Sequence, residues 1–368
     1  MVNTGRTVMP NLIRCRHLLL TLVLLNSSSG SLAQTGDEAV IGDDFESFGE
    51  FESFDDAPLE EPVNYPPWFK LSFLDLSEDI DEAITSGKQG LVVYFGQKYC
   101  PYCRKLLEGN FRELDILSYT QKHFDVIGID IYGQREVVDF DGSQWTERSF
   151  SVRNDVNFTP TMIFYDKDRA EALRLSGFYP PYKFRAALEY VADGHYQKED
   201  FRTYLARADV GMVFEAGAMN QEDFFSPPPH LLDRSHLPGE RPLAVFFEQG
   251  DCHACDVLHT GPLRQPDINT HFGKLDVAQL GMWENTPVIT PRGQRTTARK
   301  WADQLGLFYS PTIIFFDERG REILRVDSVV QFYRLRSVLE YVISGAYHRY
   351  PTFQQWRRTR QPRAPAAR

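Results

Sequence analysis

Cysteine is scarce in this chain, and cationic residues are fewer than acidic ones. Long apolar runs are missing beyond the N-terminal segment. Five cysteines in 368 residues are too few for a fold of this size to be stabilised mainly by disulfide crosslinks. A formal net charge of -11 argues against nucleic acid as the partner, because phosphate binding needs clustered positive charge. No later run is long enough to span a bilayer, so we do not expect an integral membrane protein.

What is present is globular, with 42% hydrophobic and 25% charged residues, and the length suggests two domains. Residues 1–33 carry arginines but no acidic residue, then an apolar run at 18–25 and a small-residue site ending at Ala33. The run is far shorter than the ~20 apolar residues of a transmembrane anchor. The pattern predicts a signal peptide and a periplasmic or otherwise exported protein, from which Cys15 is removed.

Acidic and basic residues are separated at the two ends of the chain. An acidic low-complexity arm, residues 34–66, holds eleven acidic residues and no basic one as far as residue 62, and repeats Phe-Glu-Ser-Phe at 45–48 and 51–54. Such sequence cannot bury enough apolar surface to fold alone, so we interpret it as a solvated spacer. The alternative is a docking arm whose phenylalanines line one face of a helix. The basic tail, 358–368, is predicted to be disordered.

Between these ends the chain repeats itself at an offset near 151 residues. The apolar run 91–95 returns as 243–247, and the Thr-Pro-Thr segment at 159–161 returns as Ser-Pro-Thr at 310–312. This period is too long for a solenoid and indicates a duplicated domain. The predicted domains are residues 67–208 and residues 209–357, the second including a Pro-rich linker at 226–229.

Each copy has the same predicted order of elements: strand, helix, strand, helix, two strands and a final helix. Apolar, β-branched runs mark the strands, and amphipathic spacing marks the closing helices at 182–193 and 332–344. This order predicts an α/β fold with a central mixed β-sheet flanked by helices.

A C-x-x-C pair follows the first strand of each copy, Cys100 with Cys103 and Cys252 with Cys255. A helix N-terminus stabilises a thiolate on the first cysteine, and two intervening residues place the second sulfur one turn away. A four-cysteine zinc site is the alternative, but zinc ribbons separate their pairs by ~15–20 residues. Here the pairs lie in different copies, so the spacing favours redox chemistry without a metal.

These motifs resemble the thioredoxin superfamily, and most closely the tandem exported bacterial thioredoxin-like proteins of the sulfur-oxidation type. The residues that carry the resemblance are the two C-x-x-C pairs together with Thr159-Pro160 and Ser310-Pro311. It covers most of residues 67–357 and implies two tandem thioredoxin-like folds. It also implies that Pro160 and Pro311 are cis, lie against the cysteines, shape the substrate groove and exclude metal.

The resemblance implies a thiol–disulfide oxidoreductase that needs no cofactor. Cys100 and Cys252 are the expected attacking thiolates, and Cys103 and Cys255 the resolving ones. The expected partners are protein or low-molecular-weight thiols and disulfides, with a membrane protein as electron donor, and we favour a reductase. An oxidase or isomerase is the alternative within the class, and a non-catalytic peptide-binding scaffold is the alternative outside it.

One departure from the family concerns proton transfer. Many members carry a buried carboxylate six residues before the first cysteine, where this chain has Tyr94 and Phe246. Glu248 is a candidate substitute in the second copy, although we interpret it as an ordinary surface residue.

The charges beside the two pairs also differ, which makes three residues candidates for tuning the thiol pKa: Lys98, Asp251 and His253. Cations favour a thiolate and a more oxidising site, so we hypothesise that the first copy is the more oxidising one. The alternative is that these charges point into solvent and are screened.

Overall fold

The computed structural model describes residues 53–208 and 218–360. The predicted signal peptide, the arm as far as residue 52 and the tail from residue 361 lie outside the described residues. Within the described part, no helix is both long and apolar enough to cross a membrane.

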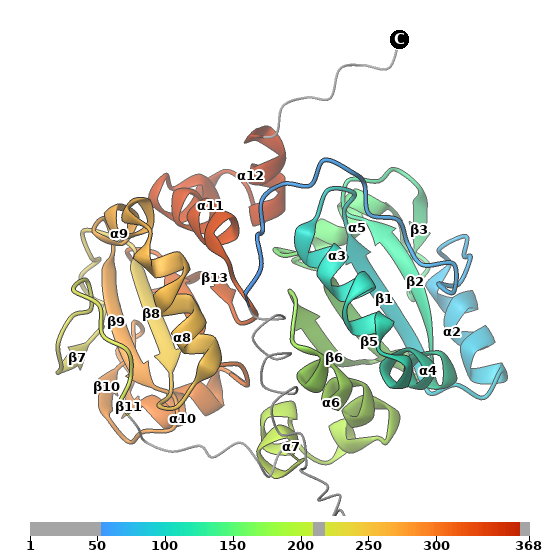
Figure 1. Ribbon diagram of the computed structural model, residues 1–368, viewed down its shortest axis with the longest axis horizontal. Coiled ribbons are helices and arrows are strands. Elements are labelled where there is room, and N and C mark those ends of the chain that lie inside the picture. Colours follow the sequence, from blue (N-terminus) through green and yellow to red (C-terminus); the bar gives the residue numbers. More distant parts are fainter. Residues whose placement is uncertain (1–52, 209–217, 361–368) are drawn as a thin grey trace, which may run out of the picture. The chain divides into compact units, whose positions relative to one another are not determined.

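The first repeat is built on a four-stranded mixed sheet (Figure 1). Its strands, in spatial order, are β2 (Phe124–Asp130), β1 (Gly90–Gly96), β5 (Thr161–Asp166) and β6 (Glu171–Ser176). β1 runs parallel to β2 and antiparallel to β5, which in turn pairs antiparallel with β6. All seven residues of β1 are buried, which is expected for a strand covered on both faces.

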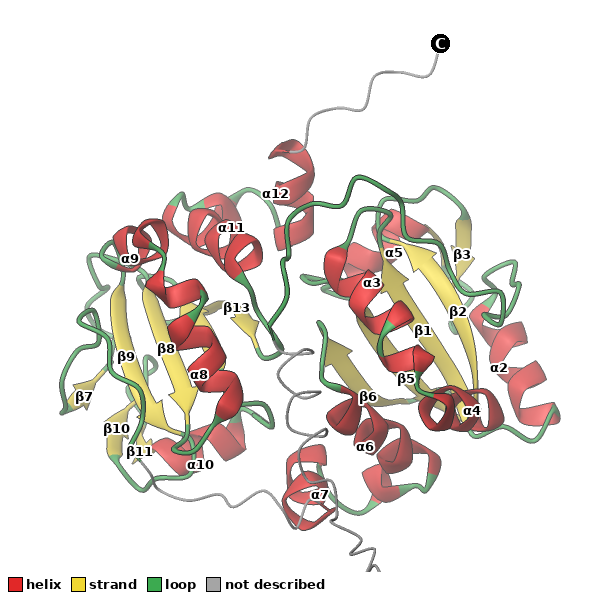
Figure 2. Cartoon of the chain, in the orientation of Figure 1, coloured by secondary structure: helices red, strands yellow, loops and turns green. Residues whose placement is uncertain are grey.

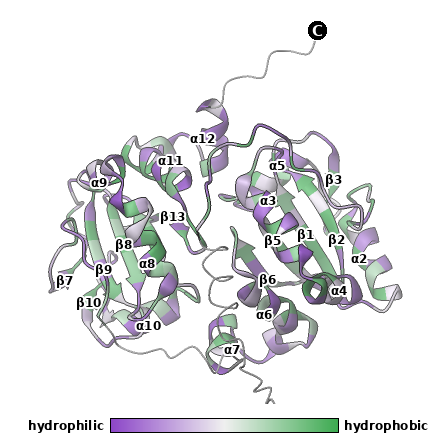
Figure 3. Cartoon of the chain, viewed as in Figure 1, coloured by the Kyte–Doolittle hydropathy of each residue, from purple (hydrophilic) through white to green (hydrophobic). Residues whose placement is uncertain are grey.

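Helices cover both faces of this sheet (Figure 2). One face carries α3 (Pro101–Glu108), α4 (Leu114–His123) and α6 (Pro181–Ala192), and the other carries α2 (Leu76–Thr85) and α5 (Glu147–Arg153). Alternate residues of β1 divide between the two cores: Tyr94 packs with α3 and α6, and Phe95 packs with α2 and α5. Figure 3 shows the apolar residues concentrated in the strands.

The second repeat has the same topology, so the predicted tandem fold is confirmed. Its strands, in spatial order, are β13 (Glu322–Val326), β12 (Thr312–Phe316), β8 (Leu243–Glu248) and β9 (Asp276–Gly281). Its helices are α8 (His253–Thr260), α9 (Pro266–Phe272) and α11 (Phe332–Ile343) on one face, with α10 (Ala298–Gln304) on the other.

Several smaller elements were not anticipated from the sequence, because they are too short for a periodic pattern. A hairpin precedes α5 in the first repeat and α10 in the second: β3 (Glu136–Val138) with β4 (Gln144–Thr146), and β10 (Pro287–Ile289) with β11 (Arg295–Thr297). Strand β7 (His230–Leu231) pairs with β10 and follows the Pro-rich linker. Each repeat ends in a short helix, α7 (Phe201–Ala208) or α12 (Phe353–Arg360).

Candidate functional site

The first cysteine pair lies at the start of α3. Cys100 is the N-cap residue of this helix, and its Sγ accepts the N–H of Cys103 at 2.9 Å. The two cysteines form a disulfide. An N-cap sulfur held by a backbone N–H, with proline fixed at the first helical position, is the arrangement that stabilises a thiolate when the disulfide is reduced.

The second pair repeats this geometry at the start of α8. Cys252 is the N-cap residue, the N–H of Cys255 donates to its Sγ at 3.1 Å, and the pair forms a disulfide. Both repeats therefore prepare the first cysteine in the same way.

A proline loop faces each disulfide. The Thr159–Pro160 and Ser310–Pro311 peptide bonds are cis, as the family resemblance implied. Cys100 Sγ lies 3.3 Å from Thr159 Oγ1, and Cys255 Sγ lies 3.3 Å from Ser310 Oγ. The four predicted loop residues and the four predicted cysteines are thus brought together as two sites, one in each repeat.

The position of the family's buried carboxylate is occupied by aromatic rings in both repeats. Tyr94 and Phe246 are fully buried beneath the sites. Burial raises the pKa of Tyr94 well above its usual range, so its hydroxyl stays protonated. A side chain at Gly96, one step nearer the disulfide on the same face of β1, would collide with the Tyr94 ring. The first repeat therefore has no room for a side chain at position 96, which corresponds to Glu248 of the second repeat, while the Tyr94 ring is present.

The second repeat differs here, and our interpretation of Glu248 as a surface residue is wrong. Glu248 is only 1% exposed, and its carboxylate contacts His259 Nε2 at 3.0 Å and accepts from Gln279 Nε2 at 2.6 Å. His259 Nδ1 lies 2.9 Å from Glu222. Burial alone lowers the pKa of His259, but the two carboxylates outweigh it and the net shift is upward. The burial of Glu248 at the end of β8 is not visible in the sequence, because it depends on contact with His259 of α8 in the folded chain.

The residues chosen as pKa-tuning candidates lie at the surface. Lys98 and Asp251 are exposed in the loops before the two helices, and His253 is exposed at the first position of α8. Solvent screens exposed charges, so any influence on the sulfurs is weak. Their role in tuning the thiols stays a prediction.

Each repeat also places a buried cation against the proline loop of the other. The guanidinium of Arg334, in the first turn of α11, lies 3.2 Å from the centre of the Tyr102 ring and 5.3 Å from that of Phe158. It donates to the Thr159 carbonyl at 2.7 Å. Lys183 of α6 corresponds to Arg334 and lies 4.4 Å from the centre of the Tyr309 ring. Neither cation stands out in the sequence, because only the folded chain shows their burial.

The described end of the acidic arm also departs from expectation. Two of its residues are not solvated, because Phe54 packs against the ring of Tyr102 and Asp56 is 5% exposed. These residues form no helix, so the helical-face alternative does not describe them either.

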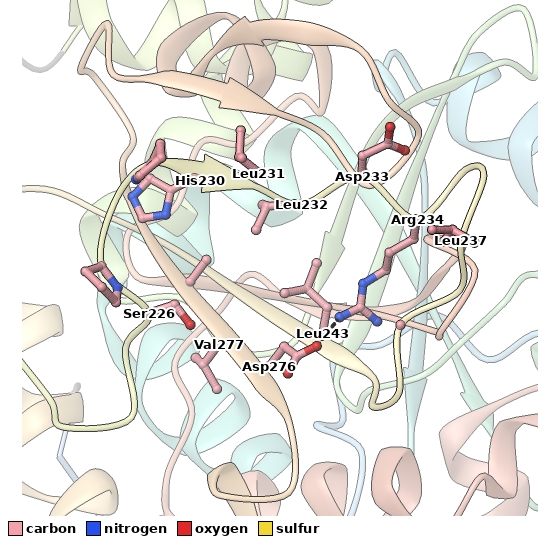
Figure 4. Close-up of a pocket in the computed structure, with 14 residues that line it drawn as sticks. Ser226, His230, Leu231, Leu232, Asp233, Arg234, Leu237, Leu243, Asp276 and Val277 are labelled. Atoms are coloured by element: carbon pink, nitrogen blue, oxygen red, sulfur yellow. Dashed lines mark hydrogen bonds and ion pairs between the residues drawn. The ribbon is translucent and has the colours of Figure 1, made fainter.

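A pocket away from both disulfides lies between the Pro-rich linker and the edge of β9 in the second repeat (Figure 4). Its volume is about 300 Å³, and Arg234 spans it to reach Asp276 at 2.7 Å. No cysteine lines it. In the described ranges, no cluster of three or more His, Cys, Asp or Glu side chains is placed to hold a metal ion.

A mixed sheet flanked by helices, a C-x-x-C disulfide at a helix start and a cis-proline facing it define the thiol–disulfide oxidoreductases of thioredoxin fold. The sequence profile of the thioredoxin-like domain family matches residues 76–192 and again residues 230–343. The chain belongs to this family.

Several solved structures are similar to parts of the chain. A thioredoxin-fold protein from Helicobacter pylori is 20% identical, with 44% of this chain and 96% of that chain covered and a TM-score of 0.32. A thioredoxin from Thermus thermophilus is 24% identical, covering 32% and 83%, with a TM-score of 0.26. A disulphide isomerase from Xylella fastidiosa is 18% identical, covering 40% and 99%, with a TM-score of 0.23. No curated protein matches the chain.

Proposed function

We propose that the protein is an exported thiol–disulfide reductase that acts on protein or low-molecular-weight disulfides through both C-x-x-C sites. The observation that carries this proposal is the pair of N-cap sulfurs, each accepting the N–H of its partner cysteine beside a cis-proline loop. An N-cap thiolate is a good nucleophile, and the neighbouring thiol resolves the mixed disulfide that it forms.

The exchange proceeds in two balanced steps. In the first repeat the Cys100 thiolate attacks one sulfur of the substrate disulfide, forming a mixed disulfide and releasing the other sulfur as a thiolate. Cys103 then loses its proton and attacks Cys100, which restores the protein disulfide and releases the second substrate thiol. Two electrons pass to the substrate, so a dithiol donor must reduce the protein again. We assign this role to a membrane protein with a thiol pair facing the same compartment.

Insulin reduction with dithiothreitol as electron source tests the activity. The Cys100→Ser/Cys252→Ser double variant should lose it, while each single variant should keep part of it. Unchanged turnover in the double variant would reject the enzyme and favour a peptide-binding scaffold.

Two further measurements address the compartment and the partners. Export predicts a mature N-terminus at Gln34, which N-terminal sequencing of the protein from its native cell will show. The Cys103→Ala and Cys255→Ala variants should trap mixed disulfides, and mass spectrometry of the trapped species will identify substrates and donor. An uncleaved chain recovered from the cytoplasm would contradict the location.

A further inference from the structure

The residues nearest the first cysteine pair include a segment from the acidic arm, which we call the strap and define as residues 53–63. The ring of Phe54 lies edge-on to Tyr102, with centroids 5.0 Å apart, and 6.0 Å from the ring of Phe178. The ammonium of Lys105 lies 5.7 Å from the centre of the Phe54 ring. An aromatic side chain is thus held by two rings and a cation, beside one of the two residues that separate the cysteines.

Two residues further on, the carboxylate of Asp56 is fully engaged. The Tyr102 hydroxyl donates to it at 2.8 Å, and the backbone N–H groups of Tyr333 and Arg334 each donate at 2.8 Å. These N–H groups belong to the first turn of the twelve-residue helix α11, where the helix dipole favours an anion. The Arg334 guanidinium adds positive charge over the Tyr102 ring.

The donors at this site are matched to a carboxylate. Burial raises the pKa of Tyr102 well above its usual range, so the hydroxyl keeps its proton and donates. Burial also lowers the pKa of Arg334 to about 10, which leaves the guanidinium charged at neutral pH. A neutral side chain in place of Asp56 would leave three donors without their anion.

Beyond Asp56 the strap continues across the first site. The Glu61 carbonyl accepts from Arg104 at 3.5 Å, and the Val63 N–H donates to the Lys98 carbonyl at 2.6 Å. Both partners flank the cysteine pair. Cys100, which lies between these two residues in the sequence, is only 2% exposed.

We propose that the first C-x-x-C site binds an extended peptide carrying an aromatic residue and, two residues later, a carboxylate, and that Phe54 and Asp56 occupy it as a tethered competitor. The inference names the substrate class for the first site and rests on the proposed function for the exchange that follows binding. An incoming substrate displaces the strap and presents its disulfide to Cys100.

The second site is not built for this pattern. Ala254 stands where Tyr102 stands in the first motif, so the second site lacks the hydroxyl donor and the ring that grip Asp56 and Phe54. Peptide selectivity of this kind therefore belongs to the first repeat alone.

The test separates the strap from its groove. In a Cys252→Ser/Cys255→Ser background, Phe54→Ala/Asp56→Asn removes both anchors of the strap and leaves the groove intact. The matched control is Asp55→Asn, since Asp55 is exposed and bonds only the N–H of Ala57. The probe is a fluorescein-labelled peptide with the sequence of residues 53–63, titrated into each protein and followed by fluorescence anisotropy.

A tethered competitor acts at millimolar effective concentration, so its removal should strengthen peptide binding about 10-fold or more over the parent and the Asp55→Asn control. A probe carrying Ala and Asn at the positions of Phe54 and Asp56 should lose that affinity. Equal binding to all three proteins, or equal binding of both probes, overturns the proposal.

A second variant keeps the proposal falsifiable if the strap variant unfolds, which circular dichroism will show. Tyr102→Ala copies the second motif and, with the wild-type strap present, should speed alkylation of reduced Cys100 several-fold because the strap loses its anchor. An unchanged rate in a folded protein contradicts the proposal.

Anisotropy does not need redox activity, so peptide binding without insulin reduction would reject only the proposed function. Reduction without peptide selectivity would reject only this inference.

Discussion

The two repeats share one fold and one way of holding a cysteine, yet they surround it differently. Cys100 is 2% exposed and the strap and α11 pack on Tyr102 beside it, whereas Cys252 is 8% exposed. The first repeat fills the space under its disulfide with the Tyr94 ring, and the second repeat builds a Glu248–His259 pair there. The two repeats therefore share the N-cap geometry that thiol chemistry needs. They differ in how far the first cysteine is exposed and in the proton-binding groups near the disulfide.

The largest expected effect is loss of the cation that touches the first site. Arg334→Met leaves the Thr159 carbonyl without its donor and Asp56 without its neighbouring charge. We expect a loss of about 3 kcal/mol in the free energy of unfolding, measured by urea titration. Arg336→Met, on the exposed side of the same helix, should cost less than about 1 kcal/mol. Equal losses would show that the burial of Arg334 contributes nothing.

The next comparison concerns Asp327, which follows β13 where the first repeat has Ser176. Burial raises the pKa of Asp327 to about 6. Because the folded pKa is above the unfolded one, this group stabilises the fold at low pH, and its contribution is lost as the pH rises from about 4 through 6. Asp327→Ser should therefore raise the free energy of unfolding relative to wild type. This gain should be larger at pH 7 than at pH 4, by up to about 3 kcal/mol.

Unfolding free energies at both pH values check this expectation, with Glu240→Gln, a substitution of an exposed carboxylate, as control. A stability difference between Asp327→Ser and wild type that does not change with pH would contradict the buried-carboxylate argument.

The buried histidine of the second repeat should produce a smaller pH effect. Since the folded pKa of His259 is raised, its ion pairs stabilise the protein fully below about pH 6.5 and are lost as the pH rises through the folded value. His259→Gln should flatten the fall in stability that the wild-type protein shows as the pH rises above about 6.5. Leu107 stands at the corresponding position of the first repeat, so Leu107→Met provides a control that leaves the slope unchanged.

The smallest effect is expected from the exposed charges beside the cysteines. We predict that the first site is more oxidising than the second, by less than about 30 mV, because Lys98 and Asp251 are screened by solvent. Equilibration of the two single-site proteins with glutathione will measure both potentials. A potential that is equal at the two sites, or lower at the first, would reject the hypothesis.

Much of this molecule could be predicted from local sequence. The apolar runs 91–95 and 243–247 are strands, and the C-x-x-C motifs open helices, because strand burial and N-capping depend on neighbouring residues. The hairpins were missed because three-residue strands leave no periodic signal. Glu248 was misjudged because its burial depends on His259 and Gln279, which lie elsewhere in the chain.

Local sequence was enough to predict the two thioredoxin-like folds and the two disulfide sites, since residues close in the chain specify both. Tertiary structure alone decided what covers the sites. Asp56 meets the backbone of Tyr333 across 277 positions of sequence, and Arg334 reaches Thr159 across 175. Composition marks Asp56 as one acid among eleven in a polar arm, and only the folded chain gives it three hydrogen-bond donors and a place beside the first cysteine pair.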